Sequence, residues 1–157
     1  MQLCKPPFLK EIGMTLSERH AQVESYLGKE VTIKIDRPVG YVHHKGEKTL
    51  VYPINYGYIP DVFGGDGEEL DVFLLGVQEP VESFTGRIIG IVYRADDVED
   101  KLVMTREGES FSAEQIARAV YFQEKYYQTT INNSNWYKRY NWSRRYIQWS
   151  SCIWYTL

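Results

Sequence analysis

The residues best suited to chemistry lie in one short acidic segment, residues 64–72. It reads Gly-Gly-Asp-Gly-Glu-Glu-Leu-Asp-Val, with carboxylates at Asp66, Glu68, Glu69 and Asp71. Carboxylates this close repel one another unless cations neutralise them, and hard cations such as Mg²⁺ prefer carboxylate oxygen. The glycines allow a tight turn, so that Asp66 and Asp71 can converge. The segment indicates a divalent-metal site, although a solvated acidic turn explains it equally well when it is considered alone.

A second acidic cluster, with carboxylates at Asp96, Asp97, Glu99 and Asp100, ends at Lys101. By itself this pattern is typical of a charged hairpin turn. The two clusters lie at the ends of neighbouring predicted strands, however, so a closed barrel could direct both toward one mouth. Paired divalent ions lower the pKa of a bridging water and hold both sides of a transferring phosphoryl group. The two clusters together therefore predict hydrolysis of a phosphoanhydride, with Lys101 stabilising charge on phosphate.

Short strands are the elements that must position these clusters. Val31, Ile33 and Ile35 alternate with polar residues, which is the period of a half-buried strand. A polar loop with two histidines follows, and residues 50–59 then form a second extended stretch, interrupted by a proline and a glycine. A turn-rich loop is predicted over residues 60–67. Three more short apolar strands are predicted over residues 71–75, 86–93 and 101–105.

Two amphipathic helices accompany the strands. The first begins with a capping box at Thr15 and Glu18 and ends at Gly28, whereas the second opens at Ser112 and runs towards Tyr127. Five or so short strands with helices at the ends predict a mainly β, α+β fold, in which a small barrel carries flanking helices.

The chain of 157 residues predicts one compact domain, which we place at residues 14–131. Residues 1–13 are predicted to be a loose arm, because two adjacent prolines argue against a helix there, and translation could begin at Met1 or Met14. Residues 132–157 hold all four tryptophans and contain no Gly, Ala, Val, Pro, Asp or Glu. This composition indicates an out-of-frame or unfolded tail that was not selected as part of the fold. The alternative is a stacking surface for single-stranded nucleic acid.

Composition narrows the partners and the compartment. The formal net charge is -3, and every Asp and Glu lies before residue 132. An acidic body repels the phosphates of nucleic acids and anionic membranes, so we expect neither as a partner. No apolar run approaches the ~20 residues of a membrane span, and charged residues interrupt any signal peptide. The two cysteines, at opposite ends, form no disulfide framework. We therefore expect a soluble, cytoplasmic protein.

Three segments, taken in order, are similar to the landmarks of a known family. They are residues 52–59 (YPINYGYI), 66–72 (DGEELDV) and 97–102 (DVEDKL). Together they resemble the soluble inorganic pyrophosphatases of the single-domain barrel type, family I, over residues 31–127. The resemblance implies an OB-like five-stranded barrel and hydrolysis of inorganic pyrophosphate to two phosphates, by several Mg²⁺ ions and a metal-bound water. Mn²⁺ could replace Mg²⁺, and related enzymes commonly form homo-oligomers.

The resemblance also implies a set of metal ligands. Asp66, Asp71 and Asp100 match the principal ligands of the family. Asp97 matches the ligand of a further metal, with Asp96 as the alternative, because the spacing in this cluster is shorter than usual. These four positions are the metal-binding candidates, with Asp96 as the alternative to Asp97.

Catalytic and substrate-binding candidates follow from the same resemblance. Glu68 falls where the family places the carboxylate that orients or deprotonates the nucleophilic water, and it is joined as a catalytic candidate by Lys101 and Tyr56. The substrate-binding candidates share either a phosphate-contacting position or a positive charge. They are Tyr56, Lys101, Tyr126, His44 and Lys45.

The chain departs from the family pattern at three positions. The family has Asp where this chain has Glu68, and misplacement of a catalytic group by ~1 Å can cost ~100-fold in rate. Lys34 stands where a glutamate is expected, and Tyr127 where a phosphate-binding lysine is expected. The departures leave two alternatives open. One is a hydrolase of another phosphoanhydride, and the other is a catalytically weak barrel that binds an anion, a protein partner or single-stranded nucleic acid.

Overall fold

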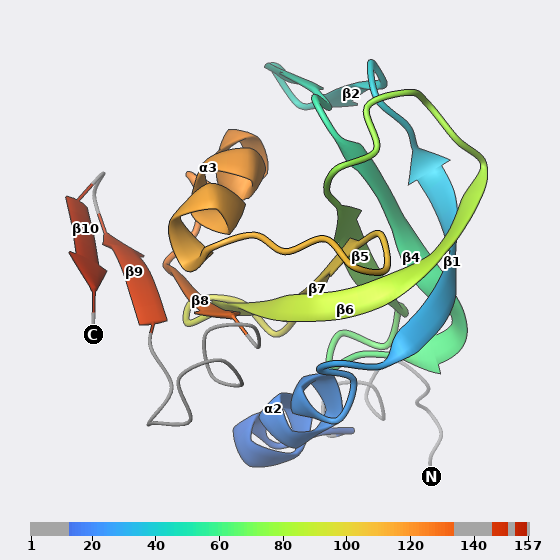
Figure 1. Ribbon diagram of the computed structural model, residues 1–157. Helices are drawn as coiled ribbons and strands as arrows, with labels where there is room; N and C mark the ends of the chain where they lie inside the picture. The colour runs from blue at the N-terminus through green and yellow to red at the C-terminus, as the bar shows by residue number, and fades with distance from the viewer. Residues whose placement is uncertain (1–12, 134–145, 151–152, 157) are drawn as a thin grey trace, which may run out of the picture.

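The computed structural model describes residues 13–133 and, for the backbone alone, residues 146–150 and 153–156 (Figure 1). The predicted N-terminal arm lies outside the described residues except for Gly13. Residues 134–145 of the predicted tail also lie outside them.

The strands fall in two groups along the described chain. The first four precede the acidic segment: β1 (Glu30–Arg37), β2 (Val42–Lys45), β3 (Lys48–Val51) and β4 (Asn55–Phe63). The others include or follow it: β5 (Glu69–Leu74), β6 (Ser83–Arg94), β7 (Lys101–Thr105), β8 (Thr129–Asn133), β9 (Tyr146–Ser150) and β10 (Ile153–Thr156).

Five of these strands close into a barrel in the order β1-β4-β5-β7-β6, because β6 pairs back with β1. Every neighbouring pair is antiparallel except β5 and β7, which are parallel. Two helices, α2 (Leu16–Glu24) and α3 (Ala113–Glu124), accompany the barrel (Figure 1). The architecture confirms the predicted mainly β fold with a five-stranded barrel and flanking helices.

The central strands bury both of their faces. Val72 and Leu74 of β5 belong to the core inside the barrel, whereas Phe73 belongs to a second core that includes Ile116 of α3. Val103 of β7 also belongs to the second core, and its neighbours along the strand belong to the first. Because side chains alternate along a strand, odd-numbered residues of β5 and β7 lie on the face that α3 covers. This alternation decides which charged residues can share a site.

Both predicted helix starts are confirmed. The Thr15 hydroxyl accepts a hydrogen bond from the Glu18 backbone N–H, and the Glu18 carboxylate accepts one from the Thr15 backbone N–H. Ser112 and Gln115 make the same reciprocal pair at the start of α3. These capping boxes satisfy N–H groups that the first helical turn leaves without an acceptor.

The predicted polar loop with two histidines is wrong, because it forms the hairpin β2–β3. His43 pairs with Leu50, and Lys45 pairs with Lys48 across the turn. Gly46 has a φ of 65°, which suits a tight hairpin turn. Most side chains of the hairpin are exposed, so no apolar alternation marks it in the sequence.

The turn-rich loop predicted over residues 60–67 is shorter than expected. Strand β4 continues through Pro60 to Phe63, with an irregular register after Tyr58 and a positive φ of 64° at Asp61. Such irregularities let a strand accommodate a proline that cannot donate to the ladder. Strand β8 was not predicted either, since the strand is short and its residues are largely polar.

Strand β8 pairs with β6, β9 pairs with β8, and β10 pairs with β9. The backbone of residues 146–150 and 153–156 therefore extends the sheet beyond the barrel (Figure 1). The domain boundaries at residues 13 and 131 stay predictions. Within the described part of the chain, no helix has the length and apolar character needed to cross a membrane.

Candidate active site

Lys101 stands at the centre of a charged cluster on the barrel. Its ammonium group donates to Asp71 Oδ2 and to the Tyr56 hydroxyl, both at 2.7 Å, and to Glu99 Oε2 at 3.1 Å. The Tyr56 hydroxyl in turn donates to Asp71 Oδ2 at 2.6 Å. Lys101 is only 1% exposed. One buried ammonium group is therefore shared by two carboxylates and fixed by a phenol.

Neighbouring strands bring these groups together. Tyr56 lies on β4, Asp71 on β5 and Lys101 at the start of β7, and these strands are adjacent in the barrel. Three of the predicted site residues thus meet on the face that α3 covers. Glu99 precedes Lys101 by two residues, so it faces the same way, and it joins the cluster although it was not a predicted site residue.

Asp100 lies apart from this cluster. Its carboxylate accepts a hydrogen bond from Arg19 Nε at 2.9 Å and another from the Arg94 backbone N–H at 3.1 Å, and it is 1% exposed. His20 Nε2 lies 3.7 Å from the same carboxylate. Because Asp100 is adjacent to Lys101 along the strand, its side chain points to the opposite face. The structure therefore places Glu99, rather than Asp100, beside Asp71.

Burial and charge shift the protonation equilibria of the cluster. Burial raises the pKa of Tyr56 far above its ordinary value, so the hydroxyl remains a hydrogen-bond donor. Burial also raises the pKa of Glu99, and the charge of Asp71 adds to this effect while Lys101 opposes it. For Lys101 itself, burial opposes the charged form, but the surrounding phenol and carboxylates raise its pKa well above the ordinary value. The ammonium group stays charged.

A β-bulge turns two further residues of β1 toward this cluster. The register with β4 shifts between Ile35 and Arg37, so Asp36 and Arg37 together oppose one residue of β4. Arg37 Nη1 donates to the Tyr52 hydroxyl at 2.5 Å. Burial raises the pKa of Asp36, Arg37 opposes the shift, and the nearby charge of Asp71 adds to it. The only sequence signal for these two residues is a charged pair at the end of an alternating strand.

Arg94 connects the acidic loop with the end of α3. Its guanidinium pairs with Glu124 at 2.6 Å, with Asp97 at 2.9 Å and with Glu99 at 3.3 Å. The same group lies 3.7 Å from the centre of the Tyr127 ring, and Arg94 is 1% exposed. This buried arginine therefore forms an ion pair with Asp97, a predicted metal ligand, and packs against the ring of Tyr127.

The turn between β4 and β5 carries the other two predicted residues, Asp66 and Glu68. Asp66 Oδ1 accepts a hydrogen bond from the Glu68 backbone N–H at 2.9 Å, and Gly67 has a φ of 82°, which favours glycine. Asp66 is half-buried, whereas Glu68 is exposed. The structure places both on the turn that leads into the strand carrying Asp71.

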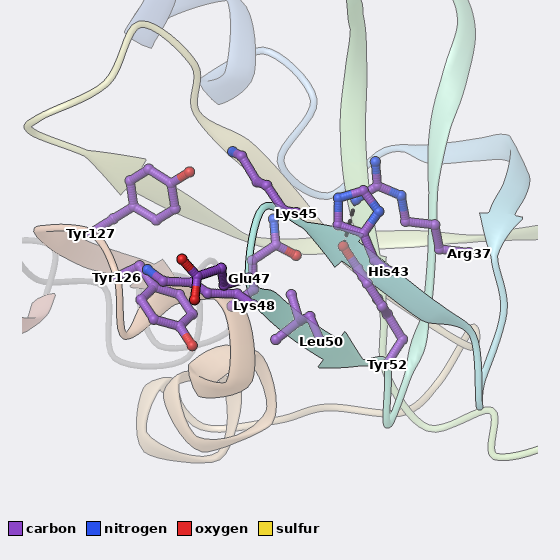
Figure 2. A pocket seen from close by; sticks show the side chains of 10 residues that line it. Arg37, His43, Lys45, Glu47, Lys48, Leu50, Tyr52, Tyr126 and Tyr127 are labelled. Atoms are coloured by element: carbon purple, nitrogen blue, oxygen red, sulfur yellow. Dashed lines mark hydrogen bonds between the residues drawn. The ribbon is translucent and has the colours of Figure 1, made fainter.

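A basic pocket of about 520 Å³ lies next to the cluster, between the β2–β3 hairpin and the end of α3 (Figure 2). Its charged lining residues are Arg37, Lys45, Glu47 and Lys48, and His43 also lines it. The remaining lining residues are Leu50, Tyr52, Gln123, Tyr126 and Tyr127. Tyr52 forms a shared wall, because its ring centre lies 5.4 Å from that of Tyr56. An anion in this basic pocket would therefore lie close to Lys101 and its carboxylates.

Some of the predicted substrate-binding residues line the basic pocket and others do not. Lys45 and Tyr126 line the basic pocket, as does His43, which was not predicted. His44 does not line it, and its ring lies 3.3 Å from the Thr49 hydroxyl on the hairpin. Burial lowers the pKa of His43, and the charge of Arg37 contributes to the shift. The positive charge of the pocket therefore rests on its arginine and lysines.

The donors of the cluster suit a hard divalent cation in type and charge. Asp71 and Glu99 share the ammonium group of Lys101, and together with the nearby Asp36 they offer only carboxylate oxygens. Among the residues that the structure describes, no three Asp, Glu, His or Cys side chains lie close enough to hold a metal ion as they are placed. The cluster offers suitable ligands, but not a closed ligand set.

The fold and the site define a small β-barrel protein with a lysine–carboxylate cluster beside a basic pocket. The sequence profile of the family described as Inorganic pyrophosphatase matches residues 21–150, which is most of the chain. The chain therefore belongs to the inorganic pyrophosphatase family. This confirms the resemblance read from the sequence, and proteins of this family are generally metal-dependent enzymes.

Individual relatives agree with this assignment. The chain is 39% identical over 74 residues to the inorganic pyrophosphatase of Saccharolobus solfataricus, covering 46% of this chain and 39% of that protein. It is 34% identical over 88 residues to soluble inorganic pyrophosphatase 2 of Chlamydomonas reinhardtii, covering 52% and 45%. The matched region thus spans less than half the length of these curated relatives.

A solved structure shares the fold. The inorganic pyrophosphatase of Ehrlichia chaffeensis matches with a TM-score of 0.51 and 19% identity, covering 72% of this chain and 91% of that chain. At this identity the match supports the barrel fold alone.

Proposed function

We propose that this protein hydrolyses inorganic pyrophosphate to two phosphates with divalent metal ions, and that Mg²⁺ is the natural metal. The observation that carries the proposal is the Tyr56–Asp71–Lys101–Glu99 cluster beside the basic pocket. The carboxylates of the cluster could bind metal cations, and the basic residues of the pocket could bind the polyanionic substrate. Membership of the pyrophosphatase family supports the choice of substrate.

In this proposal the chain's cations attract and orient the substrate. Arg37 and Lys45, which line the basic pocket, bind its phosphates. Tyr56 and Lys101 stabilise the phosphate that departs, because the ammonium group is buried and a charge-assisted hydrogen bond is strong in such a place. Tyr126 contributes a hydroxyl at the opposite wall.

The carboxylates would hold the metal ions. Asp71, Glu99 and Asp66 are the ligands that we propose, and a bound Mg²⁺ would supply a water of lowered pKa and neutralise charge on the phosphates. Several ions would bind in one site, and Mn²⁺ could replace Mg²⁺. Asp97 and Asp100 would become ligands only if they leave Arg94 and Arg19, their present partners.

Glu68 is the proposed residue that orients or deprotonates the attacking water. It lies on the exposed turn between β4 and β5, where its backbone N–H donates to Asp66. The homo-oligomeric state and the cytoplasmic location of the protein stay predictions.

One observation favours a second candidate function, a catalytically weak relative that binds an anion. The carboxylates of Asp71, Asp97 and Asp100 are each paired with a basic side chain of the chain itself. Such internal pairs compete with metal ions for the same oxygens, so they lower metal affinity.

Phosphate release from pyrophosphate, measured with and without Mg²⁺, tests the proposal. We expect Mg²⁺-dependent release from the intact chain and a loss of ~100-fold or more in the Asp71→Asn and Asp66→Asn variants. The Glu114→Gln variant removes an exposed carboxylate of α3 that pairs with Arg118, and it serves as the matched control. No release from the folded intact chain would contradict the proposal and favour the anion-binding relative.

A further inference from the structure

The guanidinium of Arg94 lies among three carboxylates. Glu124 accepts hydrogen bonds from its Nε at 2.9 Å and from its Nη2 at 2.6 Å. Asp97 and Glu99 both accept from its Nη1, at 2.9 Å and 3.3 Å. Glu124 therefore holds one edge of the guanidinium in a two-point contact, and the two carboxylates of the acidic loop meet at the remaining nitrogen.

The charge of Arg94 is permanent and fixed in place. The side chains of Arg94 and Glu124 are 1% and 0% exposed, and the Thr129 hydroxyl donates a further hydrogen bond to Glu124. A guanidinium stays protonated in proteins, and breaking one partner away from a buried ion pair is strongly destabilising. The acidic loop therefore closes over a cation that belongs to the chain itself.

Asp97 is held on both of its oxygens. Its Oδ2 accepts from Arg94, and its Oδ1 accepts from the Val98 backbone N–H at 2.7 Å. Arg19 fixes the backbone of the same loop, because it donates to the carbonyls of Asp97 at 2.9 Å and Arg94 at 3.1 Å. This predicted metal ligand is therefore tied to its position by the loop and by a buried cation.

Glu99 is held differently, because it bridges two buried cations. Its Oε1 accepts from Arg94 and its Oε2 accepts from Lys101 at 3.1 Å. The same Lys101 ammonium donates to Asp71, so Glu99 stays beside Asp71. Each carboxylate oxygen has a second lone pair, so Glu99 can still bind a metal ion together with Asp71.

We infer that Arg94 is a positioning residue that takes the place of one divalent ion between Asp97 and Glu99. It excludes Asp97 from the set of metal ligands and holds Glu99 beside Asp71. Mg²⁺ and Mn²⁺ are often held by one or two carboxylates and water, so these two carboxylates would suit such an ion if the guanidinium were absent. The inference rests on the proposed function, which assigns Asp71, Glu99 and Asp66 to the metal ions.

Counting bound Mn²⁺ by electron paramagnetic resonance tests the inference without any catalysis. The intact chain and the Asp97→Asn variant should bind the same number of ions. The double variant Arg94→Met with Glu124→Gln removes both buried charges together, so neither is left unpaired. It should bind one more ion per chain, and adding Asp97→Asn to it should abolish this gain.

Three further variants separate the charge of Arg94 from its structural role. Arg94→Lys keeps the positive charge but loses the two-point contact, and Glu124→Gln alone keeps the guanidinium, so neither should gain an ion. Arg106→Met with Glu79→Gln makes the same two substitutions in an ion pair whose side chains are 46% and 67% exposed, and it should leave the count unchanged. A gain in Arg94→Lys equal to that of the double variant would show that loosening of the loop admits the ion, and would overturn the inference.

Two other outcomes would also overturn it. One is a lower Mn²⁺ count in Asp97→Asn than in the intact chain, and the other is no gain in a double variant that circular dichroism shows to be folded. If the double variant does not fold, the comparison of the intact chain with Asp97→Asn decides the question. Mg²⁺-dependent phosphate release from pyrophosphate, together with either outcome, would leave the proposed function standing. An intact chain that binds no Mn²⁺ and releases no phosphate would remove the proposed function, on which the inference depends.

Discussion

At the residue scale, the charge balance of the site depends on Lys101. Its ammonium group is the nearest cation to both Asp71 and Glu99, at 2.7 Å and 3.1 Å. Exposed ion pairs add little to stability, but this lysine is buried and water cannot replace it. The same group that stabilises the fold is therefore the one proposed to stabilise a departing phosphate.

Replacing Lys101 by methionine should impair both stability and catalysis. The change leaves Asp71 without its cation and Glu99 paired with Arg94 alone, so we expect the free energy of unfolding to fall by about 3–5 kcal/mol. Phosphate release should fall by ~100-fold or more. Urea unfolding and a phosphate assay measure the two effects, with Lys29→Met, at an exposed lysine, as the control. Full activity in the Lys101→Met variant would exclude the proposed role of the ammonium group.

Sequence reasoning reached Tyr56, Asp71 and Lys101, which the structure brings together. It did not reach Glu99, because Val98, the apolar residue of this acidic run, is exposed and so does not reveal which side chains face the barrel. Only the start of β7 at Lys101 sets the alternation, and that boundary is known from the strand pairing. The pairing of Asp100 with Arg19 could not be predicted either, since Arg19 is 81 residues distant along the chain.

At the element scale, α2 matters because it delivers Arg19 to the barrel. The helix starts at a capping box, and one turn later Arg19 donates to Asp100 and to the backbone carbonyls of Asp97 and Arg94. The helix start thus supports the loop that precedes β7. Both capping boxes were predictable from the sequence, since they are local patterns. The β2–β3 hairpin was not, because its mostly exposed side chains show no apolar alternation, and β8 was not, because it forms by pairing with β6, which is distant along the chain.

The capping box of α2 should make stability depend on pH. Hydrogen bonds from Thr15 lower the pKa of Glu18 below its ordinary value of 4.5. A lowered pKa in the folded state adds stability above the ordinary pKa, and this stability is lost as the pH falls through the folded value. We therefore expect the intact chain to lose stability relative to Glu18→Gln as the pH falls from about 6 to about 3.

Urea unfolding of both proteins across that range measures the difference. The Thr15→Ala variant removes the cap itself and should lose about 1 kcal/mol at neutral pH. If the intact chain and Glu18→Gln respond to pH in parallel, the carboxylate does not contribute to the cap as the structure indicates.

At the scale of the whole molecule, the barrel is buried on two sides. One core fills its interior, and the other lies between the barrel and α3, and within the described residues both are built from side chains no later than Ile131. The basic pocket and the Lys101 cluster lie on the α3 side, formed by residues between Asp36 and Tyr127. Strands β9 and β10 add backbone pairing to β8, outside the closed barrel. The described residues of the site and of both cores therefore all precede these last strands.

A chain that ends at Asn133 should therefore fold and keep its activity. It retains all of β8, including Asn133, whose side-chain amide donates to the Phe111 carbonyl. It loses β9, so the unpaired edge of β8 should increase self-association. Circular dichroism, light scattering and phosphate release measure these effects. A chain that ends at Ile131 lacks two buried asparagines of β8 and should be less stable than the chain that ends at Asn133. Failure of the longer truncated chain to fold would instead make β9 and β10 an integral part of the domain, contrary to the boundary predicted near residue 131.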